Sequence, residues 1–96
     1  MIPANDFNKR KGEIKYYVSV ANFEEAIKRL IDLTRDFCKE EEKENIAIGI
    51  STSYHIIYKA ELKGTLAFSD VLREKKVIAQ NILNILPLID PNLSAE

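Results

Sequence analysis

The sequence predicts an all-α fold, a compact antiparallel bundle of about four helices, of which one is short and three are long. Three long segments repeat apolar residues every three or four positions, which is the period of an amphipathic helix. Residues that start or stop helices stand at several of their ends. Only residues 13–20 alternate as a strand does, and no second alternating segment exists to pair with them.

Length and composition indicate one soluble globular domain. Ninety-six residues supply a single core, and a hydrophobic content of 46% is too high for a disordered chain. Fourteen basic and fifteen acidic residues nearly cancel, so the chain has no general attraction to nucleic acid or to an anionic membrane. One cysteine cannot form an internal disulfide, and no segment has the roughly 18 consecutive apolar residues of a membrane span. We therefore expect a cytoplasmic protein.

The N-terminal region is predicted to be a flexible leader over residues 1–11, because it is polar, contains Pro3 and shows no apolar period. Residues 13–20 are rich in tyrosine and valine, which favour strands. Without a partner strand, however, we predict a short helix for them. A single helical domain is expected over residues 12–90, followed by a frayed tail at 91–96.

The second helix begins after Asn22, a residue type suited to the N-cap, and Glu25 completes a variant of the capping box. We expect it to end in the charged run at residues 39–44, which is typical of a solvated helix end and turn. Its apolar face is continuous and consists of Phe23, Ala26, Ile27, Leu30, Ile31, Leu33, Thr34, Phe37 and Cys38.

The third helix is predicted over residues 45–63, because Gly64 suits the left-handed position that follows a helix end. No charged residue occurs between Asn45 and Tyr58, although 30% of the chain is charged. Such a helix usually touches neighbours on several sides. Its main face is Ile46, Ala47, Ile50, Tyr54, Ile57, Tyr58 and Ala60.

The last helix is predicted over residues 68–86 and ends before Pro87. Lys75 falls near the middle of its apolar face, so we expect this side chain to reach the edge of the core or to meet a carboxylate. The predicted face is Phe68, Val71, Leu72, Ile78, Ala79, Ile82, Leu83, Ile85 and Leu86.

Catalytic and cofactor-binding patterns are missing from the sequence. The single histidine, His55, and the single cysteine, Cys38, provide no metal-ligand spacing, and Cys38 continues an apolar face as a core thiol would. Three scattered glycines cannot form a phosphate-binding loop. We therefore predict no catalytic residues, no metal, no cofactor and no enzymatic activity.

A candidate partner-binding surface lies on the third helix. Ile48 and Ile56 point away from its main apolar face, and no charge occurs there until Lys59. Two exposed isoleucines favour a patch that another subunit covers. The alternative is that the leader or the first helix covers the patch within the same chain. The predicted surface comprises Ile48, Thr52, His55, Ile56 and Lys59.

A nucleic-acid surface is the alternative prediction. Basic residues followed by aromatic ones can hold a single strand by charge and by stacking. The chain has one such cluster, Lys9, Arg10, Lys11 and Lys15, with Tyr16 and Tyr17 beside it. The other interpretation of this cluster is a solubilising leader.

Three segments resemble the effector-associated adaptor domains of bacterial conflict and immunity systems, which are small death-fold-like helical modules. The resemblance covers about residues 13–90. Two departures are Ala67, where a serine cap is usual, and Lys59, which stands late for the basic residue that follows the aromatic near Tyr54. The matching segments are Glu13-Ile14-Lys15 with Asn22-Phe23-Glu24-Glu25-Ala26-Ile27, then Ile48-Gly49-Ile50-Ser51-Thr52-Ser53-Tyr54, then Gly64-Thr65-Leu66-Ala67-Phe68 with Asp70, Arg73-Glu74, Ile78 and Ile82-Leu83.

This resemblance implies a non-enzymatic adaptor that joins like helical domains, either on a second copy of the chain or on an effector protein, in bacterial defence or signalling. It implies a homo-oligomer as one form of the protein. No functional residues carry over, because the matching positions are core and turn positions. We expect no membrane partner. The alternatives are a helical subunit that organises RNA in a nucleoprotein complex and an immunity-type protein that neutralises a toxin.

Overall fold

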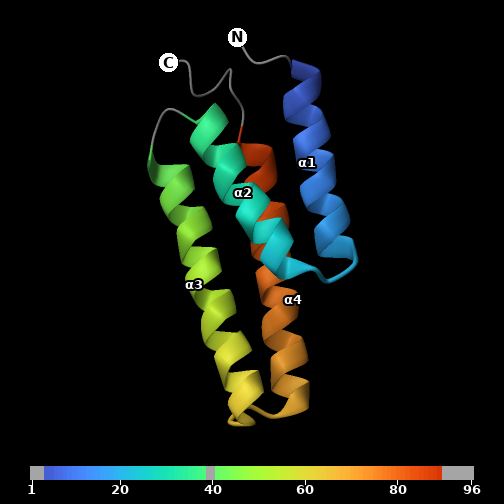
Figure 1. Ribbon diagram of the computed structural model, residues 1–96, viewed down its shortest axis with the longest axis vertical. Coiled ribbons are helices and arrows are strands. Elements are labelled where there is room, and N and C mark those ends of the chain that lie inside the picture. The colour runs from blue at the N-terminus through green and yellow to red at the C-terminus, as the bar shows by residue number, and fades with distance from the viewer. Residues whose placement is uncertain (1–3, 39–40, 90–96) are drawn as a thin grey trace.

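The computed structural model describes residues 4–38 and 41–89, and these form four α-helices and one short 3-10 helix. The elements are α1 (Ala4–Ser19), α2 (Phe23–Phe37), α3 (Glu41–Lys63), α4 (Phe68–Ile85) and η1 (Leu86–Leu88). No strand occurs in the described residues. The predicted all-α, four-helix bundle is therefore confirmed, as Figure 1 shows.

Helix α1 is longer than the sequence suggested. It begins at Ala4 and has 16 residues, so residues 4–11, which we expected in a leader, are helical. Phe7 and Ile14 are buried and lie two helical turns apart on one face. The ring of Phe7 packs against that of Phe37 with 4.8 Å between centroids. Two apolar residues seven positions apart are too sparse a pattern to predict a helix, and tertiary packing supplies the rest.

Helix α2 follows its prediction closely. The side-chain oxygen of Asn22 accepts a hydrogen bond from the backbone N–H of Glu25 at 3.4 Å, which is the predicted cap. The reciprocal half of the capping box is not formed, because the N–H of Asn22 donates to the carbonyl of Tyr17 at 2.8 Å. Arg29 forms an ion pair with Glu25 at 2.9 Å. The buried residues of the helix are Phe23, Ala26, Ile27, Leu30, Leu33, Thr34 and Phe37. Its continuous apolar face therefore forms the centre of the core.

The bounds of α3 and α4 differ slightly from the prediction. Helix α3 begins at Glu41 instead of Asn45, because part of the charged run is helical and Glu44 pairs with Arg35 of α2 at 2.9 Å. It ends before Gly64, whose φ of 68° is the left-handed conformation that glycine permits. Helix α4 begins at Phe68 as predicted and passes at Leu86 into η1, which contains Pro87.

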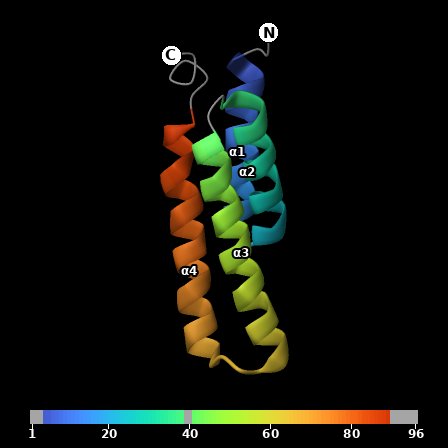
Figure 2. The same ribbon diagram turned by 90° about the vertical axis from the view of Figure 1, so that its left-hand side faces the viewer.

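The helices form a long hairpin with a shorter pair of helices packed on its upper part. Helices α3 and α4 run antiparallel as a hairpin, α2 packs on both, and α1 lies on α2, with the upper ends of α1 and α2 extending beyond the hairpin (Figures 1 and 2). Lys75 of α4 meets Glu61 of α3 at 3.2 Å, which confirms that it finds a carboxylate. The molecule is correspondingly elongated, at 46 × 24 × 16 Å.

The far end of this hairpin leaves apolar side chains uncovered, contrary to the prediction. Phe68 and Leu72 were expected on the buried face of α4, but they are 75% and 46% exposed. Tyr58, and also Ile46 and Leu83 near the other end of the hairpin, were expected to face the core as well, but each is more than one-third exposed. The 23 residues of α3 extend about 35 Å, whereas the 15 residues of α2 extend about 22 Å. Helices α1 and α2 are therefore too short to cover the hairpin to its end.

This difference in burial leads to a stability prediction. Leu30→Ala removes a fully buried side chain from the centre of the core and should lower the free energy of unfolding by about 2–5 kcal/mol. Leu62→Ala makes the same chemical change at a side chain that is 70% exposed, and should change stability by less than about 0.5 kcal/mol. Urea unfolding of dilute protein measures both. Equal losses in the two variants would contradict the burial described here.

Candidate protein-binding surface

The five residues that the sequence singled out lie together on the surface of the molecule. They line a shallow, open depression between α2 and α3, to which Ile31 of α2 and Ser51 of α3 also contribute. Ile31 was assigned to the core of α2, but it lies at the edge of the core and is partly exposed. The five residues are Ile48, Thr52, His55, Ile56 and Lys59, and all of them are exposed.

The fold presents this patch on the outer side of α3. Ala47, Ile50 and Ile57 point into the core from the opposite side of the helix. Ile48 is 45% exposed and Ile56 is 64% exposed. Helix α1 packs mainly on α2, and it does not bury these isoleucines. The described part of the chain therefore leaves the patch open, against the alternative that the first helix covers it.

The polar groups of the patch are occupied by hydrogen bonds within α3. The hydroxyl of Thr52 donates to the backbone carbonyl of Ile48 at 3.1 Å. Nδ1 of His55 lies 2.8 Å from the backbone carbonyl oxygen of Ser51, which accepts the hydrogen. Lys59 is the only charged side chain among the five. The surface accordingly offers methyl groups and an imidazole face, which suits contact with another apolar surface.

A second depression continues the first along the groove between α2 and α3. It shares Ile31, Ser51 and His55 with the first and is lined further by Glu24, Ile27, Lys28 and Tyr54. Burial raises the pKa of the Tyr54 phenol above its usual value, with a smaller contribution from the charge of Glu24. Tyr54 therefore stays neutral at physiological pH and packs its ring between Phe23 and Tyr58, with centroids 6.2 and 6.1 Å away.

Within the residues that the structure describes, no catalytic arrangement surrounds Cys38 or His55. Cys38 follows α2 and is packed against the core, as expected for a core thiol. Nδ1 of His55 lies 2.8 Å from the backbone carbonyl oxygen of Ser51 and 3.5 Å from its hydroxyl, and the imidazole ring meets the Tyr54 ring edge-on at 5.7 Å between centroids. No group of three His, Cys, Asp or Glu side chains in residues 4–38 and 41–89 is placed to hold a metal ion.

No helix among these residues is both long enough and apolar enough to cross a membrane.

The predicted nucleic-acid cluster lies on α1 and is partly engaged within the bundle. Arg10 pairs with Asp36 at 2.8 Å, and its guanidinium lies 5.4 Å from the centre of the Phe37 ring. Nζ of Lys11 lies 5.1 Å from the centre of the Phe7 ring. Lys9 and Lys15 are exposed. Two of the four cations are therefore exposed, and the other two lie against aromatic rings.

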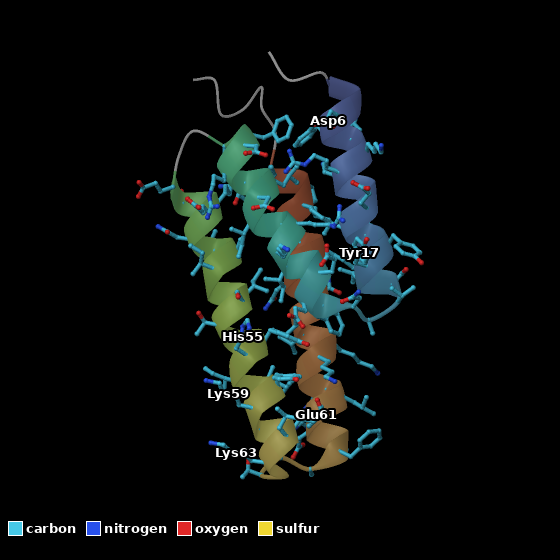
Figure 3. The ribbon with its side chains drawn as sticks, viewed as in Figure 1. Asp6, Tyr17, His55, Lys59, Glu61 and Lys63 are labelled. Atoms are coloured by element: carbon cyan, nitrogen blue, oxygen red, sulfur yellow. The ribbon has the colours of Figure 1, made fainter. Side chains whose placement is uncertain are left out.

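The aromatic residues next to this cluster also have different surroundings. Tyr16 is 61% exposed. The guanidinium of Arg29 lies over the ring of Tyr17, 5.0 Å from the ring centre, and Tyr17 is labelled in Figure 3. Arg29 also meets Glu13 at 3.6 Å and Glu25 at 2.9 Å. The charges between α1 and α2 are thus largely neutralised by one another.

Comparison with known families places the chain among effector-associated domains. The family described as Effector-associated domain 11 matches residues 9–90, which is most of the chain and all of the helical bundle from the first turns of α1 onward. This match confirms the resemblance drawn from the three sequence segments. Neither the curated proteins nor the solved structures contain a significant match to the chain.

Two neighbouring isoleucines test whether the patch is surface or core. Ile56→Glu places a carboxylate on a side chain that is 64% exposed, so the protein should stay folded with little change in melting temperature. Ile57→Glu, one position away, places the same carboxylate at a site that is only 7% exposed and should unfold the protein. Circular dichroism of both variants measures this. Unfolding of the Ile56 variant would mean that the patch is part of the core.

Proposed function

The chain belongs to the family of Effector-associated domain 11, and from this premise we propose that it is a non-enzymatic adaptor domain that associates with like helical domains. One partner is a second copy of the chain, and another is a related domain on an effector protein. Its proposed place is the cytoplasm, where it recruits the effector in bacterial defence or signalling.

The observation that carries this proposal is the open apolar patch on α3. Ile48 and Ile56 expose about half of their surface or more, next to the partly exposed Ile31. Fully burying an isoleucine side chain contributes about 1.5–3 kcal/mol, so covering the exposed parts of these side chains favours association. An isolated bundle gains nothing from keeping them in water. A partner surface of the same kind removes both patches from water at once.

The chemical character of the patch supports binding over catalysis. A catalytic site joins a nucleophile, a base and a group that stabilises developing charge. The patch has one imidazole, hydrogen-bonded to its own helix, and one lysine four residues away. Apolar side chains dominate instead, as they do in the centres of protein interfaces.

The RNA-organising alternative rests on the exposed Lys9 and Lys15 of α1. Arg10 supports it less, because its charge already pairs with Asp36. The toxin-neutralising alternative would use the same apolar patch toward a foreign protein. The proposal predicts that the purified chain associates with itself, whereas the alternatives require RNA or a foreign protein. Experiments on the purified chain therefore separate them.

Light scattering over a wide concentration range tests homotypic association. We expect the molar mass to rise from the 11.0 kDa monomer toward a dimer or larger at both low and high salt, because apolar burial resists screening. Ile56→Glu should remain at the monomer mass. A wild-type protein that stays monomeric throughout would contradict self-association. Binding to single-stranded RNA that weakens steeply with salt would favour the nucleic-acid alternative instead.

A further inference from the structure

The outer face of α3 carries a residue pattern that is symmetrical about Thr52. Seven exposed positions follow one another along this face in steps of four, three, four, four, three and four residues. Each position therefore has a counterpart at an equal distance on the other side of Thr52. The seven residues are Glu41, Asn45, Ile48, Thr52, Ile56, Lys59 and Lys63, and we call them the α3 stripe.

The counterparts in this stripe are chemically complementary. Ile48 and Ile56 each lie four residues from Thr52, so the two isoleucines are counterparts. Glu41 and Lys63 each lie eleven residues away, and they carry opposite charges. Asn45 and Lys59 lie seven residues away. Between the two charged ends, Asn45 to Tyr58 contains no charged residue.

The charges divide α3 into an acidic beginning and a basic end. Glu41, Glu42 and Glu44 lie in its first turn. Arg35 of α2 pairs with Glu44 at 2.9 Å and Lys43 with Glu42 at 4.0 Å, while Glu41, on the stripe, is exposed. Lys59 and Lys63 are exposed at the other end, and Figure 3 shows both on the side of α3 that faces away from α4. Glu61, the acidic residue between them, faces Lys75 of α4 at 3.2 Å.

From this pattern we propose that two copies of the chain pair along the α3 stripe, with the two α3 helices antiparallel and Thr52 on a two-fold axis. The arrangement rests on the proposed function, because it specifies how like domains would associate. The two-fold axis places Ile48 of each copy against Ile56 of the other. It also brings Glu41 of each copy to Lys63 of the other, which a parallel pairing would not do.

Local features of the stripe permit close approach of two helices. The hydroxyl of Thr52 is bonded to the carbonyl of Ile48, so its methyl group is free to pack at the axis. Gly49, beside the stripe, is exposed, and nothing lies within 4 Å of the position that a Cβ would take. Helices with small residues at the contact approach to about 8 Å between axes.

The size of the stripe determines how strongly we expect two copies to pair. Stable complexes bury about 1,200–2,000 Å² in total, and one helix face on each copy supplies less than that. We therefore expect weak pairing that needs concentrated protein, with charge pairs at both ends that make it tighter at low salt. Apolar contact at the centre keeps part of the affinity at high salt.

A charge-exchange experiment tests the antiparallel register. The first variant is Lys59→Glu with Lys63→Glu, and the second is Glu41→Lys with Asn45→Lys. In each variant alone, like charges meet at both ends of the stripe, so we expect dimerisation to weaken at least tenfold. Mixed in equal amounts, the two variants present opposite charges and should form a 1:1 heterodimer at least as tight as the wild-type dimer. Lys9→Glu with Lys15→Glu is the matched control on α1 and should dimerise as the wild type does.

The outcomes of this experiment separate the geometry from the function. A wild-type dimer together with a mixture that restores nothing would overturn the antiparallel stripe and leave homotypic association intact. A wild-type chain that is monomeric at every concentration would overturn both. Equal weakening in the α1 control would show a general charge effect and would also overturn the proposed register.

A cross-linking experiment tests the position of the axis independently. The background for this experiment is Cys38→Ser, which removes the native thiol. In it, Thr52→Cys places one thiol of each copy at the axis. The two Cα atoms then come close to the separation of about 4.4–6.8 Å that a disulfide spans. We expect a disulfide-linked dimer under mild oxidation. The control is Lys63→Cys in the same background, whose two copies would lie about 33 Å apart and should not cross-link. Equal cross-linking at both positions would overturn the axis at Thr52.

Discussion

The burial of one apolar face of α2 is the interaction on which the rest of the bundle depends. Helix α2 packs against α1 on one side and against α3 and α4 on the other. Leu30 and Leu33, both fully buried, lie at the centre of this contact. Helix α1 has only a few apolar residues of its own, and it joins the fold by packing against α2. Without this face, α3 and α4 would be a two-helix hairpin with most of its apolar surface in water.

The length of α2 then determines which surfaces stay open. At 15 residues it covers part of a hairpin built from helices of 23 and 18 residues. It also packs against the inner side of α3, so the outer side keeps Ile48 and Ile56 exposed. Exposure of these apolar side chains to water is unfavourable for the isolated chain. The uncovered end of the hairpin thus follows from the length of α2, and the exposed stripe follows from the side of α3 against which α2 packs.

Much of this fold could be predicted from the sequence, and the exceptions have physical causes. Helix α2 was predictable because a capping residue and a continuous apolar face agree with one another. Residues 4–11 were not predictable as helix, because Phe7 and Ile14 give too few apolar positions and α1 depends on its contacts with α2. The exposure of Phe68 was equally hidden, since periodicity identifies an apolar face but not whether another helix is long enough to cover it.

The candidate surface, like the fold, could be predicted from the sequence only in part. The five residues could be grouped from the sequence, because their spacing places them on the side of α3 away from its main apolar face. Ile31 could not be added to them, since only the crossing of α2 over α3 brings it beside Ser51. Whether the surface binds a partner depends on a second molecule, about which one chain's periodicity carries no information. The symmetry about Thr52 is a property of the sequence that acquires meaning only once the stripe is known to be exposed.

We propose that like domains meet on the open face of α3. The most direct test is a concentration series of amide NMR spectra of the isotope-labelled chain. We expect the resonances that shift with concentration to cluster on α3 from Glu41 to Lys63 and on the adjoining Ile31, while those of α1 stay constant. Shifts confined to α1, or spectra that do not change with concentration at all, would contradict it.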